Sequence, residues 1–174
     1  MNERREPVTV AFATLGCKLN QYDTAELQAL LEGRGFRTVP FETSAQLYVI
    51  NTCTVTARAD ISDRQAIRRA VARNPDAVVV VTGCYAQTNP QAVARIAGVD
   101  LVLGTPDKYA LPDLLDGLQK RVRPLVRVGD VFESRRLPVI PLRQFAPGYT
   151  RAFVKVQDGC QHRCAFCIVP FARG

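Results

Sequence analysis

The feature that most constrains this chain of 174 residues is a regular alternation of strand-like and helix-like segments. Short apolar runs rich in β-branched residues predict buried strands at residues 8–15, 47–51, 77–82 and 101–103. Amphipathic patterns predict helices that begin near Asp23, Ala57, Pro90 and Leu111. Because strands alternate with helices, the sequence predicts an α/β fold in which helices flank a parallel sheet.

The longest helical pattern occupies residues 57–73 and is closed by Asn74-Pro75. Its spacing predicts a buried face formed by Ile61, Ile67, Ala70 and Val71. The helix before it is predicted to bury a leucine face formed by Leu27, Leu30 and Leu31.

Residues 120–149 depart from this alternation and predict a linker after a first domain at residues 1–119. The segment contains four prolines, and its seven basic residues from Lys120 to Arg143 face only two acids. We expect one short strand within it, at residues 125–128. A new domain is predicted to begin at residues 150–174, where a strand with the sequence RAFVKVQ leads into three closely spaced cysteines.

The net charge of +7 and the pI of about 9.4 favour a polyanionic partner such as nucleic acid. Nineteen of the 23 basic residues are arginine, a bias that genomic base composition also produces, so a merely solvated basic surface is the alternative. No apolar run reaches the roughly 18 residues of a membrane helix, and we expect no membrane-spanning segment.

Six cysteines could form three disulfides in an exported protein. The N-terminal segment MNERREP carries two glutamates, and the short apolar run after it is interrupted by Thr9 and Thr14, which is atypical of an export signal. We therefore expect a cytoplasmic protein, in which closely spaced thiols bind metal or react rather than pair.

Three of the cysteines directly follow predicted strands. Cys17, Cys53 and Cys84 are separated by 36 and 31 residues, about one β-loop-α-loop unit each. Because the carboxyl ends of parallel strands lie along one edge of a sheet, these thiols are predicted to converge. Converging thiols suit a soft metal centre, such as a [4Fe-4S] cluster with one open iron, whereas the alternative is three ordinary buried cysteines.

The other three cysteines form a C-x3-C-x2-C array in one loop, at Cys160, Cys164 and Cys167. Three thiolates from one loop can again bind a four-iron cluster and leave one corner free. The alternative is a zinc site completed by His162, although a C-x-H-x-C-x2-C spacing is unusual for zinc.

Four motifs, in this order, resemble those of the radical S-adenosylmethionine (SAM) methylthiotransferases: TLGCKLNQYDTAEL, NTCTVT, VTGCYAQ and GCQHRCAFCIVPFARG. The last is similar to the cluster loop of radical SAM enzymes, and the others are similar to the N-terminal methylthiotransferase domain. Two branches of this family modify the adenosine beside the tRNA anticodon, as isopentenyladenosine or as N6-threonylcarbamoyladenosine. A third modifies an aspartate of a ribosomal protein. The stretch GCKLNQYD most resembles the threonylcarbamoyladenosine branch.

This resemblance implies two [4Fe-4S] clusters and SAM as cofactors. The cluster that cleaves SAM to a 5′-deoxyadenosyl radical, which removes hydrogen from C2 of the adenine, would be bound by Cys160, Cys164 and Cys167. The auxiliary cluster that presents the sulfur would be bound by Cys17, Cys53 and Cys84. A second SAM would supply the methyl group.

Three further residues receive roles from the resemblance. Phe166 would lie near the SAM adenine, and Asn20 and Asn51 would donate hydrogen bonds at the auxiliary site. The partners implied are tRNA and a reducing electron donor, and we expect a monomer.

The segment 150–174 supplies only the first strand and cluster loop of a radical SAM barrel. We therefore expect an N-terminal fragment with a truncated barrel, inactive by itself, whose tail is poorly ordered because its strand has no partner. The alternative to an enzyme is a non-catalytic iron-sulfur or zinc scaffold.

Overall fold

The computed structural model describes residues 6–115, 118–133, 140 and 153–174. It contains six strands: β1 (Thr9–Thr14), β2 (Arg37–Val39), β3 (Leu47–Thr52), β4 (Val78–Gly83), β5 (Leu101–Leu103) and β6 (Leu125–Arg127). The longer helices are α1 (Lys18–Glu32) and α2 (Ala57–Arg73). The shorter ones are α3 (Cys84–Thr88), α4 (Pro90–Ala94), the 3-10 turn η1 (Lys108–Ala110), α5 (Leu111–Leu114) and α6 (Val169–Arg173).

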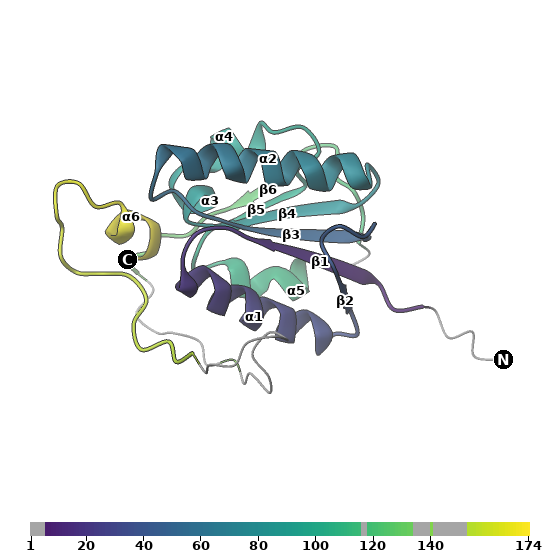
Figure 1. Ribbon diagram of the computed structural model, residues 1–174, viewed down its shortest axis with the longest axis horizontal. Coiled ribbons are helices and arrows are strands. Elements are labelled where there is room, and N and C mark those ends of the chain that lie inside the picture. The colour runs from purple at the N-terminus through teal and green to yellow at the C-terminus, as the bar shows by residue number, and fades with distance from the viewer. Residues whose placement is uncertain (1–5, 116–117, 134–139, 141–152) are drawn as a thin grey trace.

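All six strands form one parallel sheet in the order β2-β1-β3-β4-β5-β6 (Figure 1). The predicted α/β fold with a parallel sheet is therefore confirmed. Strand order reverses between β1 and β3, because the chain first moves outward to β2 and then returns. Such a switch point opens a crevice at the carboxyl ends of β1 and β3, where α/β proteins bind ligands.

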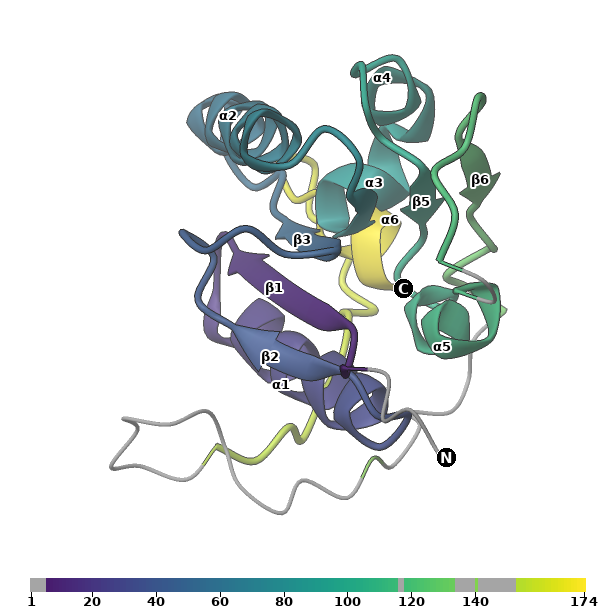
Figure 2. The same cartoon turned by 90° about the vertical axis from the view of Figure 1, so that its right-hand side faces the viewer.

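Helices cover both faces of the sheet, with α1 and α5 on one side and α2 and α4 on the other (Figure 2). Each face has its own apolar layer, because alternate residues of a strand point to opposite faces. In β4, Val79 and Val81 pack in the layer that includes Ile67 of α2, whereas Val78 and Val80 pack in the layer that includes Leu27 of α1. Both central strands are buried along their whole length, which explains why they read as continuous apolar runs.

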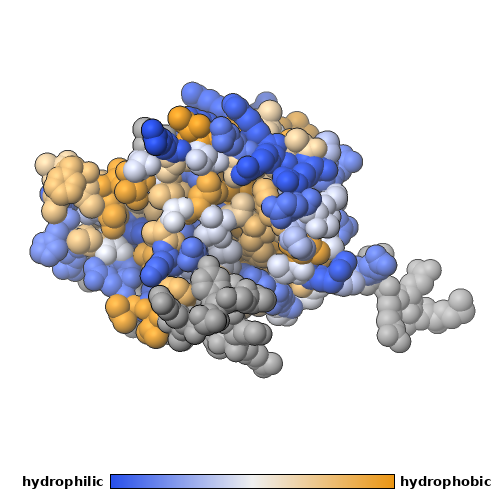
Figure 3. All heavy atoms as spheres, viewed as in Figure 1, coloured by the Kyte–Doolittle hydropathy of each residue, from blue (hydrophilic) through white to orange (hydrophobic). Residues whose placement is uncertain are grey.

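Helix α1 begins five residues before the position that the apolar pattern predicted. Its first turns bury Asn20, Asp23 and Glu26, so the apolar periodicity starts only at Leu27. Helix α2 matches its predicted bounds, and Thr56 caps it by accepting a hydrogen bond from the backbone N–H of Ala59. The predicted burial of Ile61 is wrong, because the residue is 50% exposed. Much of the surface over α2 is hydrophilic, with some hydrophobic residues among the polar ones (Figure 3).

Four short elements were not predicted: β2, α3, η1 and α6. Each has five residues or fewer, too short for a periodic pattern to identify. The strand expected near residues 125–128 is confirmed as β6, and it pairs with β5. The sheet therefore extends beyond residue 119, the predicted end of the first domain.

The strand expected at residues 151–157 is wrong for the described part of that segment. Residues 153–157 form no regular structure, and residues 151 and 152 lie outside the described residues. The segment instead runs along the domain and leads to α6, which contacts α3 (Figure 1). The tail was expected to be poorly ordered for want of a strand partner, but its described part is held by polar side chains. Within the described residues, no helix has both the length and the apolar character needed to cross a bilayer.

The two isoleucines of α2 provide a direct test of this packing. Ile67→Ala should lower the free energy of unfolding by about 2–5 kcal/mol, because it leaves a cavity under α2. Ile61→Ala should change it by less than about 0.5 kcal/mol, because Ile61 lies at the surface. Urea denaturation followed by circular dichroism measures both. Equal effects of the two substitutions would contradict the described orientation of α2.

Candidate functional site

Cys17 and Cys53 flank the switch point of the sheet. Cys17 follows β1 and is the N-cap of α1, and Cys53 follows β3 directly. Gly16 has a φ of 95°, and a Cβ placed on it would lie 2.6 Å from both Cβ and Sγ of Cys53. The turn that carries Cys17 therefore lies directly against Cys53, and only glycine allows this approach.

Cys84 occupies the corresponding position after β4. It is buried at the first residue of α3. Burial raises the pKa of its thiol, and the nearby Arg173 guanidinium opposes that shift. The register of β3 and β4 pairs Thr52 with Gly83, so Cys53 and Cys84 follow neighbouring positions at the carboxyl edge of the sheet.

Asn20 ties the loops of the first two cysteines together. Its amide Nδ2 donates to the carbonyl oxygens of Leu15, at 2.7 Å, and of Thr52, at 2.9 Å. These carbonyls stand just before the two cysteine turns. Both N–H bonds of the amide are therefore used within the protein, and Asn20 holds the two loops together.

Asn51 has a similar structural role. Its Nδ2 donates to the backbone oxygen of Asn20, at 2.9 Å, and to the hydroxyl of Thr24, at 3.1 Å. Its Oδ1 is buried and has no hydrogen-bond partner among the described residues. A Cβ on Gly83 would collide with that oxygen, so glycine is required immediately before Cys84.

The carboxylate of Asp63 in α2 binds the backbone of Cys53. Its Oδ2 accepts a hydrogen bond of 3.0 Å from the backbone N–H of Cys53, whereas its Oδ1 has no partner among the described residues. Desolvation raises the pKa of this fully buried carboxyl to about 7, although the bond from Cys53 works against the shift. The carboxyl therefore fixes the backbone of a predicted ligand.

The donor set at this edge fits an iron-sulfur cluster in kind. Thiolates are the ligands that such clusters take, and here they come from three neighbouring strand ends. Among the residues that the structure describes, no group of three or more His, Cys, Asp or Glu side chains is close enough to hold a single metal ion. A [4Fe-4S] cube binds each thiolate through a different iron, so its ligands stand farther apart than those of one ion.

The second array lies in the loop before α6. The backbone N–H of Cys160 donates to the carbonyl of Gly174, at 2.6 Å, and the N–H of Cys167 donates to the carbonyl of Cys164, at 3.0 Å. The loop is thereby closed on itself, with Cys164 exposed and the other two thiols partly exposed. His162 is also exposed, and the described side chains do not assemble the alternative zinc set around it.

An open cavity of about 880 Å³ lies beside this loop, lined in part by Val131, Phe132, Cys160, His162 and Arg173. Phe166, expected near a SAM adenine, is 93% exposed. Phe171 packs edge-on against Phe132 with ring centroids 6.4 Å apart, which joins the loop to the segment after β6.

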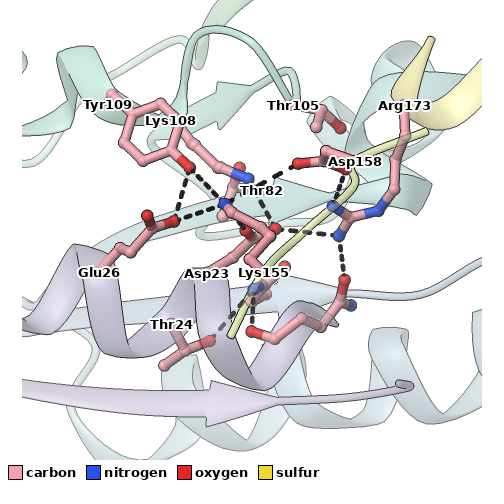
Figure 4. Close-up of polar contacts among 12 residues, drawn as sticks. Asp23, Thr24, Glu26, Thr82, Thr105, Lys108, Tyr109, Lys155, Asp158 and Arg173 are labelled. Carbon is pink, nitrogen blue, oxygen red and sulfur yellow. Dashed lines mark hydrogen bonds and ion pairs between the residues drawn. The ribbon is translucent and has the colours of Figure 1, made fainter. Parts of the chain in front are cut away.

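A buried network of six charged side chains connects this loop to the sheet (Figure 4). Asp23 of α1 is its centre. Its carboxylate contacts Lys108 at 2.6 Å, Arg173 at 3.0 Å and Lys155 at 3.1 Å. Burial alone raises the pKa of Asp23, but the three cations outweigh it and hold that pKa below its ordinary value. Asp23 is therefore ionised near neutral pH.

Two other carboxylates complete the network. Glu26 accepts from Lys155 at 2.8 Å and from the hydroxyl of Tyr109 at 2.7 Å. Asp158 pairs with Arg173 at 2.7 Å. All six charged side chains are between 1% and 9% exposed, and three positive charges balance three negative ones. The balance matters because an unpaired charge is costly in such a setting.

None of these six residues was predicted from the sequence as a site residue. One signal was present: Cys17, Asn20, Asp23 and Glu26 recur every three residues along the start of α1. Residues at that spacing are neighbours on a helix, so a polar stripe continues from a predicted ligand along a buried face. Lys155, Asp158 and Arg173 in the tail belong to no comparable repeat in the sequence.

The chain is similar to curated tRNA methylthiotransferases over nearly all of its length. It is 45% identical over 166 residues to the threonylcarbamoyladenosine tRNA methylthiotransferase MtaB of Bacillus subtilis, covering 95% of this chain and 37% of that protein. It is 47% identical over 165 residues to the protein of the same name from Aquifex aeolicus, covering 95% and 40%. A tRNA-2-methylthio-N(6)-dimethylallyladenosine synthase of Geotalea uraniireducens is 33% identical over 168 residues, covering 92% and 37%.

The chain thus spans 37 to 40% of the length of these relatives. The resemblance to the methylthiotransferases, read from four motifs, is confirmed by these matches. A family model also matches residues 9–104, which include β1 to β5 and the first three cysteines. This chain therefore belongs to the family described as uncharacterized protein family UPF0004.

Proposed function

We propose that the protein carrying this chain is a tRNA methylthiotransferase that acts on C2 of N6-threonylcarbamoyladenosine beside the anticodon. The observation that carries the proposal is the 45 to 47% identity, over 95% of this chain, to proteins named for that substrate. Two more proteins of that name match at 37% and 31%, and the proteins named for dimethylallyladenosine match at 32 to 36%. The three thiols that follow neighbouring strands support methylthiotransferase chemistry, which both substrates share.

The proposed cofactors are SAM and two [4Fe-4S] clusters, held by two cysteine trios: Cys17, Cys53 and Cys84, and Cys160, Cys164 and Cys167. When bound, these groups supply the radical chemistry at C2 and the sulfur and methyl group that replace its hydrogen. The chain's own residues orient the ligands. Asn20 joins the first two cysteine turns, and Asp63 fixes the backbone of Cys53.

The remaining partners follow from the chemistry. A net charge of +7 suits a polyanion such as tRNA, and reductive cleavage of SAM needs an electron donor. We propose a monomer that works in the cytoplasm. The exposed ring of Phe166 is available to a SAM adenine placed beside the second loop.

Iron content tests the two cysteine trios. After anaerobic reconstitution, the protein carrying this chain should bind about eight iron atoms, and alanine substitution of either trio should leave about four. Colorimetric iron and sulfide determination measures this, and electron paramagnetic resonance identifies the cluster type. Zinc in place of iron in the native protein would instead support the non-catalytic scaffold.

Asp63 allows a finer test. Asp63→Ala removes the acceptor for the Cys53 N–H and should weaken iron retention about 10-fold or more under a chelator, since groups behind metal ligands commonly have effects of that size. Asp63→Asn keeps an oxygen acceptor and should retain iron nearly as well as the unsubstituted protein. If Asn and Ala behave alike, the hydrogen bond to Cys53 has no such role.

The substrate is tested by mass spectrometry of tRNA nucleosides from a strain lacking the gene. The methylthio group should disappear from threonylcarbamoyladenosine and remain on isopentenyladenosine. Its disappearance from isopentenyladenosine, or from a ribosomal-protein aspartate, would reassign the substrate within the family. An unchanged set of methylthio groups would refute the proposed activity.

A further inference from the structure

The charge network divides into two complementary halves. The half contributed by α1 and η1 has two carboxylates, Asp23 and Glu26, and one ammonium, Lys108. The half contributed by the tail has two cations, Lys155 and Arg173, and one carboxylate, Asp158. Each half alone carries an unbalanced buried charge of one unit, and the unbalanced charges have opposite sign. Docking of the tail therefore neutralises both, and a buried charge left unpaired is strongly unfavourable.

Arg173 lies at the junction of the two cysteine trios. Its guanidinium donates to Oδ1 of Asn20, at 2.5 Å, and to Oδ2 of Asp23, at 3.0 Å. Asn20 is the residue that joins the turns of Cys17 and Cys53. The guanidinium therefore contacts the residue that holds two loops of the first cysteine site together.

The other contacts of Arg173 belong to the second loop. Its Nη1 donates to Oδ1 of Asp158, two residues before Cys160. The next residue, Gly174, accepts the backbone N–H of Cys160. On the other side of α6, the hydroxyl of Thr105 donates to the carbonyl of Ala172 at 2.8 Å. The rigid planar fork of an arginine can satisfy several acceptors at fixed angles, which a lysine cannot do.

Lys155 provides a second, separate attachment. Its side chain is 4% exposed, whereas its neighbours Val154 and Val156 are 78% and 87% exposed. The segment thus turns this cation inward and the two valines outward, the opposite of ordinary packing. Electrostatic pairing with Asp23 and Glu26, rather than apolar burial, determines this orientation.

From this arrangement we infer that Lys155 and Arg173 form a latch that docks the second cysteine loop on the carboxyl edge of the sheet, and that Arg173 is a positioning residue shared by both cysteine sites. The latch sets the separation between the two trios. Its consequence for catalysis rests on the proposed function, because only a reaction that uses both trios on one substrate atom depends on that separation.

Hydrogen exchange of the 174-residue chain tests the latch without any cofactor. Arg173→Gln should speed amide exchange in peptides from 158–174 by at least about 100-fold, because breaking a buried ion pair commonly has an effect of that size. Peptides from β3 and β4 should be unchanged, since the Asp23–Lys108 pair remains within the sheet domain.

Two further variants make the result decisive. Lys155→Gln breaks the contacts to α1 without touching a cysteine and should also loosen residues 158–174, even if Arg173→Gln prevents folding. Arg34→Gln is the matched control, because Arg34 pairs with Asp113 at 2.8 Å but both side chains are more than half exposed; it should leave exchange unchanged. If neither Lys155→Gln nor Arg173→Gln changes amide exchange in residues 158–174, the proposed latch is wrong.

The catalytic consequence is measured in the reconstituted whole protein. Arg173→Gln should lower methylthiolation of tRNA about 100-fold, as expected for a misplaced reacting group, while release of 5′-deoxyadenosine from SAM continues. Iron content, measured alongside, should stay at the unsubstituted level. Equal losses of both reactions, or no loss of either, would contradict a positioning role. Absence of methylthiolation in the unsubstituted protein would refute the proposed function instead and leave the exchange result to decide the latch.

Discussion

Parallel strand pairing is the constraint on which the rest of this structure depends. When every strand of a sheet runs the same way, all strand ends lie on one edge, and residues far apart in sequence become neighbours there. Cys17, Cys53 and Cys84 each follow a strand, so pairing of β1 with β3 and of β3 with β4 brings them together. The cysteines need not be close in sequence, because the hydrogen bonds between the strands set which strand ends are neighbours.

Small residues and amide side chains then convert this rough convergence into a defined site. Gly16 and Gly83 adopt backbone conformations that bring the turns against their neighbours without a Cβ. Asn20 and Asn51 use both hydrogens of their amides to tie those turns together. The site therefore has a frame of hydrogen bonds that fixes the positions of the turns.

The balanced charge network has a different physical role from the apolar layers. Apolar contacts are tolerant of small shifts, whereas buried ion pairs are stable only when donors and acceptors meet with good geometry. A segment attached through Lys155 and Arg173 can therefore dock in very few positions. This requirement for one docking position gives a physical reason for burying six charged side chains between the sheet and the second cysteine loop.

The sequence by itself determined the fold class, the positions of the main strands along the chain and the edge of the sheet to which the first three cysteines belong. These follow from local periodicity, since apolar strand runs and the helical pattern of α2 are visible within windows of ten to eighteen residues. The start of α1 could not be obtained this way, because its first buried residues, beginning at Asn20, are polar. The exposure of Ile61 could not be obtained either, because it depends on which face of α2 packs against the sheet.

Only the tertiary structure decided that β6 joins the sheet and that the second cysteine loop lies beside the first trio. The contacts responsible join residues up to 153 positions apart, as between Asn20 and Arg173, and no short window of sequence contains both partners. A lysine or an arginine in a tail looks like a solvated charge until a buried carboxylate is placed next to it. The physical reason is that charge pairing, unlike hydrophobic periodicity, leaves no local repeat in the chain.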